Sequence, residues 1–174
     1  TIDGNLFANG IVYVFNQAGV VVGPNGVIDT AGFIAGAANL SNQDFLNDVD
    51  RFTDVSGDVV NYGSIRASGL VALVGQTVAN HGTIVAPRGM VVLAAGDDVL
   101  LSEQGGHIHA RITGASHKLA AMAGIDNTGS IDAQGGQVLL AAGDMYSVAI
   151  YNEGDVTGQT VKFEGQGSGI VQVA

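Results

Sequence analysis

Two groups of side chains in this sequence have the chemistry of a metal site. His107 and His109 lie two residues apart, so on a β-strand both imidazoles would project from one face, the minimum arrangement for a transition-metal pair. Asp48, Asp50 and Asp54 supply three nearby carboxylates, the ligands that Ca²⁺ prefers. The histidine pair has no third ligand at a suitable spacing, and the carboxylates lack the glycine and the terminal glutamate of an EF-hand loop. We therefore expect exposed loop histidines, a solvated acidic turn, and no metal or cofactor.

An enzyme that cleaves polysaccharides would need carboxylates that converge on one exposed strand face. Asp97, Asp98 and Asp144 instead follow Ala-Ala-Gly in two similar segments, where aspartate is a common turn residue. The sequence has no Gly-x-Ser-x-Gly nucleophile elbow, no phosphate-binding loop followed by lysine, and no His-Glu-x-x-His zinc motif. We expect a non-enzymatic protein. A polysaccharide-active enzyme is an alternative, and Asp, Lys or Arg side chains gathered in one groove would indicate it.

The composition is apolar, rich in glycine and acidic. Hydrophobic residues make up 47% of the 174-residue chain, enough to form a core, and there are 27 glycines and no cysteines. With 6 basic against 16 acidic side chains, the formal net charge is −10. This balance argues against nucleic acid as a partner, because nucleic-acid binding needs basic patches. The longest apolar runs have about five residues, far fewer than the roughly 18 of a membrane helix, so no transmembrane segment is expected.

An internal repeat indicates how these residues are positioned. Residues 80–97 and 127–144 are near copies, separated by 127 − 80 = 47 residues. The repeated unit begins with Asn-x-Gly, which occurs at Asn61 and Gly63, Asn80 and Gly82, Asn127 and Gly129, and Asn152 and Gly154. The other two intervals are 80 − 61 = 19 and 152 − 127 = 25 residues, about one turn of a β-solenoid with three short strands.

The repeat predicts both a fold and a role for its asparagines and glycines. Asparagine and glycine accept positive φ angles readily, so these positions are predicted to be structural corners between strands. Stacked coils would then place Asn on Asn, and Val or Ile on Val or Ile, about 4.8 Å apart. The predicted fold is all-β: a right-handed parallel β-helix of roughly seven to nine coils with extra-helical loops or hairpins. An antiparallel sandwich whose hairpins use Asn-Gly corners is the alternative.

A single β-helix domain is expected to cover residues 1–174. Residues 1–35 would form a cap over the first coil. Residues 41–58 are polar and acidic and interrupt the repeat, and residues 105–118 insert histidines between the two near copies. We expect both segments to be excursions from the solenoid.

The N-terminal segment carries a family motif. Ala8-Asn9-Gly10 precedes an apolar strand at residues 12–15, and Asn16-Gln17-Ala18-Gly19-Val20 follows it. This order resembles the secretion domain of the filamentous haemagglutinin family of two-partner secretion proteins, which has Asn-Pro-Asn-Gly-[Val/Ile] after that strand. The central Pro-Asn is Gln17-Ala18 here, and residues 40–46 are similar to the family's acidic Asp-Phe-Leu segment. The resemblance implies a right-handed parallel β-helix and marks Asn16, Gln17, Ala18 and Gly19 as the secretion motif.

The resemblance also implies a function. In the family this motif is linked to secretion through a partner outer-membrane translocator barrel, which implies a secreted or cell-surface protein of a bacterium with an outer membrane. We expect a non-enzymatic domain of haemagglutinin or adhesin type, acting in adhesion, secretion or extracellular scaffolding, with a receptor on a host or other cell surface. The alternative is an extracellular filament subunit, because residues 169–174 offer a β-edge to which a second copy can add end to end.

Overall fold

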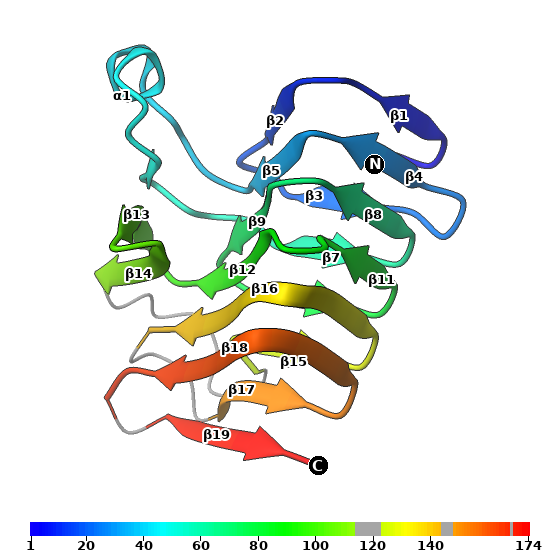
Figure 1. Ribbon diagram of the computed structural model, residues 1–174. Helices are drawn as coiled ribbons and strands as arrows, with labels where there is room; N and C mark the ends of the chain where they lie inside the picture. The colour runs from blue at the N-terminus through cyan, green and yellow to red at the C-terminus, as the bar shows by residue number, and fades with distance from the viewer. Residues whose placement is uncertain (114–122, 144–147, 168) are drawn as a thin grey trace.

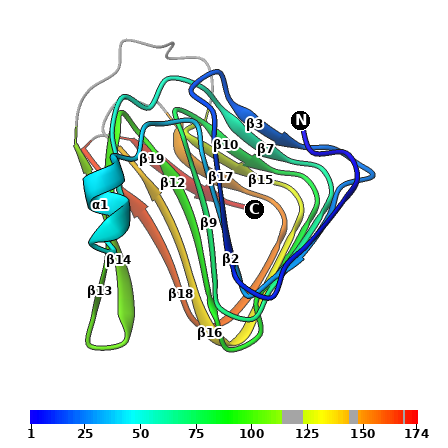
Figure 2. The ribbon, with the colours of Figure 1, turned by 90° about the horizontal axis from the view of Figure 1, so that it is seen from above.

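The chain winds into a parallel β-helix (Figure 1). The computed structural model describes residues 1–113, 123–143, 148–167 and 169–174. In these ranges the chain forms six coils, each built from three strand segments that pair with neighbouring coils. Seen from above, the coils superpose on a three-sided outline (Figure 2). The predicted all-β parallel β-helix is confirmed.

Three faces of parallel strands enclose the core. The first face contains β1 (Asn5–Phe7), β4 (Val27–Thr30), β8 (Ser64–Ala67), β11 (Thr83–Val85) and the first parts of β16 (Ser130–Ala142) and β18 (Asp155–Gly165). The second face contains β2 (Ile11–Phe15), β5 (Gly32–Gly36), β9 (Leu70–Gly75), β12 (Met90–Ala95) and the later parts of β16 and β18. The third face contains β3 (Val20–Val22), β7 (Val59–Asn61), β10 (Val78–Asn80), β15 (Ile125–Asn127), β17 (Val148–Asn152) and β19 (Ile170–Val173).

Similar side chains stack on one another in the interior. On the first face, the parallel register places four buried isoleucines directly over one another, namely Ile28, Ile65, Ile84 and Ile131. Each coil therefore buries its apolar side against its neighbours, which a single coil cannot do alone. The stacking of Ile on Ile that the repeat predicted is present.

The number of coils differs from the prediction. Six coils form in the described residues, against the roughly seven to nine expected from the repeat length. Two segments leave the helix, one between β5 and β7 and one between β12 and β15. These segments use chain length without adding a coil, so dividing the chain by the repeat length overestimated the number.

A second apolar cluster lies outside the helix, on the outer side of the second face. Val92 and Ala94 of β12 point outward here and are nevertheless buried. They are covered by a small sheet of β6 (Arg51–Phe52), β13 (Asp98–Gln104) and β14 (His107–Thr113), which we call the outer sheet. The inner side chains of the outer sheet, including the fully buried Phe52, complete this cluster. The middle strands of the second face are therefore buried on both sides.

The two segments outside the helix contain the antiparallel pairs found among the described residues. Every pair within the three faces is parallel, so the sandwich alternative is wrong. The first segment includes α1 (Asn42–Leu46) and β6, within residues 41–58. The second segment contains the β13–β14 hairpin, which begins at Asp98 rather than at residue 105. Residues 114–118 of the expected excursion lie outside the described residues.

Local sequence explains the hairpin and its attachment. Its turn residues, Gly105 and Gly106, have φ angles of 60° and 77°, the positive values that a two-residue type I′ turn needs. The Gln137 side chain on β16 then holds the hairpin tip against the helix. Its Oε1 accepts from the Ile108 N–H at 3.4 Å, and its Nε2 donates to the Gly106 carbonyl.

The N-terminal residues belong to the helix itself. Residues 1–35, which were expected to cap the first coil, supply β1 to β4 and most of β5. Their side chains Ile2, Leu6, Val12 and Val14 pack against the interior core. No helix among the described residues is long and apolar enough to span a membrane.

Candidate functional site

Residues 16–19, the secretion motif implied by the resemblance, form a tight turn between β2 and β3. The Gly19 N–H donates to the Asn16 carbonyl at 2.8 Å, the hydrogen bond that closes a four-residue β-turn. The Asn16 side chain accepts from the Ala18 N–H at 3.0 Å, a local bond that favours asparagine at the first turn position. Asn16, Gln17 and Ala18 are exposed. The 16–19 turn is thus a surface feature of the first coil.

The 16–19 turn is fixed against the next coil. Gly19 has a φ of 113°, and a Cβ there would lie 2.8 Å from the Asp58 carbonyl oxygen. The adjacent Gly57 also lies close to the turn, and a Cβ on it would lie 2.6 Å from the Gln17 carbonyl oxygen. The Ser56 hydroxyl donates to that same carbonyl at 2.9 Å. The main chain of the turn is therefore held in place, while the Gln17 and Ala18 side chains remain exposed.

The four corner asparagines form one continuous ladder inside the helix. Asn61 Nδ2 donates to Asn80 Oδ1 at 2.8 Å, Asn80 Nδ2 to Asn127 Oδ1 at 2.8 Å, and Asn127 Nδ2 to Asn152 Oδ1 at 2.6 Å. The Gly63 N–H donates to Asn61 Oδ1 at one end, and Asn152 Nδ2 donates to the Gly154 carbonyl at the other. All four asparagines are at most 4% exposed. Buried amides are stable here because each finds a partner in the neighbouring coil.

The corner glycines are required for a different reason from the one predicted. None of the eight corner residues has a positive φ, so the explanation by positive φ is wrong. The glycines stack instead: a Cβ on Gly82, Gly129 or Gly154 would lie 2.1, 2.2 or 1.9 Å from the carbonyl oxygen of the glycine in the preceding coil. A Cβ on Gly63 would likewise lie 2.4 Å from the Gly26 carbonyl oxygen. Close backbone approach between coils therefore excludes any side chain at these corners.

The residues considered as metal ligands do not come together as a metal site in the part of the chain that the structure describes. His107 and His109 do share the exposed face of β14, and His107 Nδ1 lies 3.2 Å from Gln137 Oε1. Asp54 Oδ2 accepts from Asn39 Nδ2 at 3.1 Å, whereas Asp50 Oδ1 accepts from the Tyr13 hydroxyl at 3.4 Å. Among the described residues, no group of three or more His, Cys, Asp or Glu side chains is arranged to hold a metal ion.

Asp50 provides a test of how the first coil packs on the segment that carries α1. Burial raises the pKa of Asp50, the hydrogen bond from Tyr13 lowers it, and nearby Asp48 raises it, with a net upward shift. A carboxyl whose folded pKa is raised favours folding while it is protonated, and this contribution is lost as the pH rises through the folded pKa. Asp50→Asn keeps an acceptor for Tyr13 and removes the charge. We expect it to raise the Tm at pH 7 by a small amount.

Thermal unfolding of Asp50→Asn and the unchanged protein, followed by circular dichroism between pH 3 and pH 8, checks this expectation. The Tm difference should shrink toward zero below the ordinary aspartate pKa of about 3.9. Asp155→Asn, at an exposed carboxylate in β18, is the control. A constant difference across the pH range would show that Asp50 is not the group responsible.

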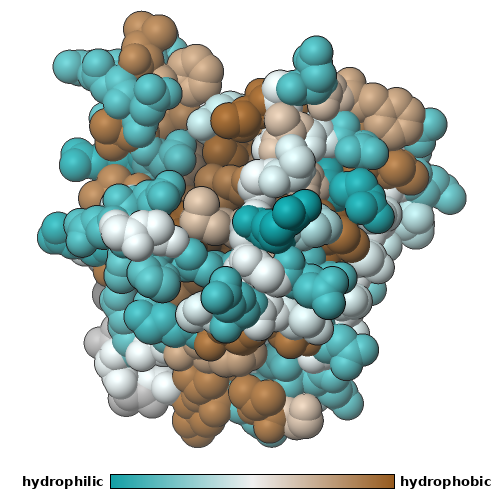
Figure 3. Space-filling view, in the orientation of Figure 1, coloured by the Kyte–Doolittle hydropathy of each residue, from teal (hydrophilic) through white to brown (hydrophobic). Residues whose placement is uncertain are grey.

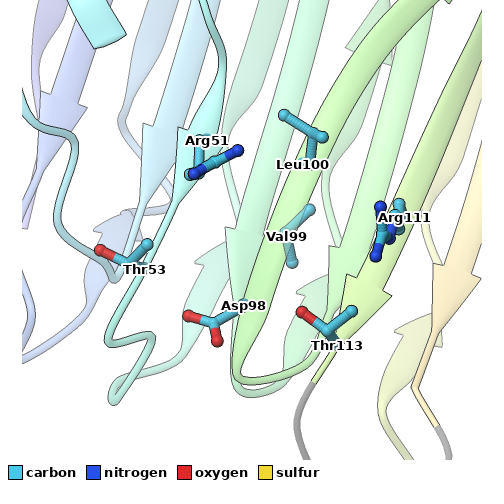
Figure 4. Close-up of a pocket in the computed structure, with 7 residues that line it drawn as sticks. All are labelled: Arg51, Thr53, Asp98, Val99, Leu100, Arg111 and Thr113. Carbon is cyan, nitrogen blue, oxygen red and sulfur yellow. The ribbon is translucent and has the colours of Figure 1, made fainter. Parts of the chain in front are cut away.

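Sequence reasoning missed one arrangement of charged residues. Arg51, Asp98 and Arg111 line a single pocket of about 240 Å³ on the outer sheet (Figure 4). Charged side chains gathered in one groove were the feature that would indicate a polysaccharide-active enzyme. Most glycoside hydrolases use a pair of carboxylates, whereas this pocket has one, so the pocket does not have the arrangement of such an enzyme. Asp97 bonds instead to Gln76, and Asp144 lies outside the described residues. The three residues come from separate strands, so no local motif could reveal the pocket.

Comparison with known proteins places the chain in a family. The profile of the TPS secretion domain family matches residues 1–172. Among solved structures, the chain is similar to the crystal structure of the HMW1 secretion domain from Haemophilus influenzae, with a TM-score of 0.70 and 28% sequence identity. That match covers 88% of this chain and 40% of the HMW1 chain. A search of curated proteins finds no match. The resemblance seen in the sequence is confirmed, and the chain belongs to the TPS family of two-partner secretion domains.

Proposed function

We propose that this domain is the part of an exported protein that a partner outer-membrane transporter recognises, and that the 16–19 turn lies in the recognised surface. The family match over residues 1–172 carries the proposal, because TPS domains work with such a transporter. The structure adds a reason to choose the turn. Its main chain is fixed by Gly57 and Ser56, so a partner would meet a preorganised surface and would lose little entropy on binding.

The side chains that vary from the family motif are suited to recognition. Gln17 and Ala18 replace the family's Pro-Asn, and both are exposed. Because Ala18 does not have a positive φ, the turn has the backbone of type I, in which proline is favoured at the position of Gln17. A type I turn also accommodates proline at that position, so the replacement of Pro-Asn by Gln17-Ala18 changes the exposed side chains without requiring a different turn. A transporter that recognises this chain would contact the side chains of Gln17 and Ala18.

A secretion assay tests the proposal. Gln17→Lys is expected to reduce the amount of protein exported to the medium about tenfold, which corresponds to about 1.4 kcal/mol of lost binding, in cells that co-express the cognate transporter. Its Tm should be unchanged, because the side chain is exposed. Gln159→Lys makes the same change of charge at an exposed corner of the last coil and should be exported normally. Normal export of Gln17→Lys would exclude the turn from the recognised surface.

For the domain taken alone, the last coil supports a second candidate, end-to-end assembly. Ile170, Val171 and Val173 of β19 are 60%, 40% and 59% exposed, and apolar side chains gather at this lower end of the molecule (Figure 3). The first coil likewise exposes Phe7 and Ile11 at the opposite end. A second copy could continue the parallel sheets from one end to the other, and repetition of that contact would give a filament.

Light scattering tests this candidate. The molar mass of the purified chain should increase with concentration, and Val173→Lys should keep it monomeric because a charge would enter the contact. Val27→Lys, at a valine 39% exposed on the side of the helix, is the control. A constant monomer mass for the unchanged chain would exclude self-assembly.

Adhesion and receptor binding are proposals about the exported protein as a whole. The chain spans 40% of the solved HMW1 chain that it matches. We therefore assign the secretion role to this domain. Haemagglutinin-type adhesion is proposed for the exported protein that contains it.

A further inference from the structure

The outer face of the outer sheet presents two arginines on either side of one leucine. Leu100 of β13 is paired with Arg51 of β6 on one side and with Arg111 of β14 on the other. Residues directly opposite each other on antiparallel strands share a face, so these three side chains point the same way. Figure 4 shows the arginines flanking Leu100. The next row of the sheet, Phe52, Val99 and Ile112, faces the helix and is buried.

These arginines stand out against the charge of the whole chain. The chain carries 16 acidic and only 6 basic side chains, yet two of the six basic residues line this one small pocket. Within the part of the chain that the structure describes, the one ion pair joins Lys162 and Glu164, and neither Arg51 nor Arg111 has an acidic partner within ion-pair distance. Both arginines are exposed. Their guanidinium groups are therefore available to an external anion.

The remaining pocket residues restrict what that anion can be. Thr53, Asp98 and Thr113 form the second outward-facing row, next to the arginines. A carboxylate accepts hydrogen bonds and repels anions, whereas a threonine hydroxyl both donates and accepts. Half-buried Leu100 adds an apolar surface between the two arginines. A ligand that interacts with all of these side chains has an anionic group for the arginines, hydroxyl donors for Asp98 and the threonines, and an apolar surface for Leu100.

We propose that this pocket binds a carboxylated sugar, such as one uronic acid unit of an acidic polysaccharide. The carboxylate would lie between Arg51 and Arg111, since guanidinium groups bind carboxylates with charge-assisted hydrogen bonds. The ring hydroxyls would donate to Asp98 and exchange hydrogen bonds with the threonines, and the apolar side of the ring would pack on Leu100. The volume of about 240 Å³ is below the roughly 300–1,000 Å³ of typical small-molecule sites, as expected for a single sugar unit of a longer chain. The proposal is independent of the secretion role.

Calorimetric titration of the full chain with trigalacturonic acid tests the proposal. Arg51→Gln and Arg111→Gln are each expected to weaken binding at least tenfold. Arg66→Gln removes the same charge from an exposed arginine on the first face and should change affinity less than twofold. Neutral trigalactose should not bind measurably. Equal losses in all three arginine variants would mean that net charge alone drives binding, and the proposal would be wrong.

Asp98→Asn distinguishes a sugar site from a simple anion site. If Asp98 accepts from ring hydroxyls, the variant should bind trigalacturonic acid several-fold more weakly. If the pocket takes only an anion, the variant should bind inorganic phosphate and trigalacturonic acid more tightly, because a repulsive charge has been removed. That second outcome, or the absence of any binding of trigalacturonic acid, would overturn the assignment.

Discussion

Asn80→Leu should lower the free energy of unfolding by about 2 to 5 kcal/mol. Asn80 is fully buried in the middle of the asparagine ladder, where it accepts from Asn61 and donates to Asn127. Leucine has the same branched arrangement of heavy atoms but can do neither, so Asn61 Nδ2 loses its acceptor and Asn127 Oδ1 loses its donor. Each unsatisfied buried group is expected to contribute about 1 to 3 kcal/mol to the loss.

Urea unfolding followed by circular dichroism measures this effect. Asn5→Leu makes the same substitution at an exposed position of β1 and should change stability by less than about 0.5 kcal/mol. A loss below about 1 kcal/mol for Asn80→Leu would show that the ladder does not hold the coils together.

Gly129→Ala should destabilise the protein even more than Asn80→Leu. We expect the free energy of unfolding to fall by more than about 4 kcal/mol and little folded protein to be recovered. The added Cβ would lie 2.2 Å from the Gly82 carbonyl oxygen and 2.9 Å from the Gly82 nitrogen. Both are backbone atoms of the adjacent coil, so relief requires that two coils move apart. Such a movement would also stretch the Asn80 to Asn127 hydrogen bond beside it.

Two further variants give this prediction its controls. Gly10→Ala introduces the same methyl group where nothing lies within 4 Å, and it should leave stability unchanged or raise it by about 0.4 to 1 kcal/mol. Gly129→Asn separates the two explanations of the corner glycines. Asparagine tolerates positive φ well, so it would be accepted if φ were the reason for glycine. The stacking of glycines seen in the structure predicts that Gly129→Asn lowers the free energy of unfolding at least as much as Gly129→Ala does.

The repeat made the fold predictable because a β-helix places equivalent residues of successive coils on top of one another. Asn80 and Asn127 are 47 residues apart in sequence and adjacent in space, so their common sequence context reports a direct contact. The motifs at residues 8–10 and 16–19 indicated the family because each forms one turn of the first coil. Their order in the sequence therefore follows the path of that coil.

The outer sheet could not be predicted in the same way. It depends on pairing between β6 and the β13–β14 hairpin, which are far apart in sequence and share no repeat. One signal was present: residues 90–95 are apolar without alternation, a pattern typical of strands that are buried on both faces. This pattern indicates that something covers the outer side of β12, but it does not identify the cover. The pocket between Arg51 and Arg111 therefore became visible only in the structure.

Export of a passenger protein is the most direct test of the central claim, that this β-helix is a secretion domain recognised through its first coil. Residues 1–174 would be fused ahead of a passenger that is not otherwise secreted, and the passenger would be quantified in the medium with and without the partner transporter. We predict export only when the transporter is present, and a reduction of about tenfold with Gln17→Lys but not with Gln159→Lys. Export without the transporter, or equal export of the two variants, would contradict the claim.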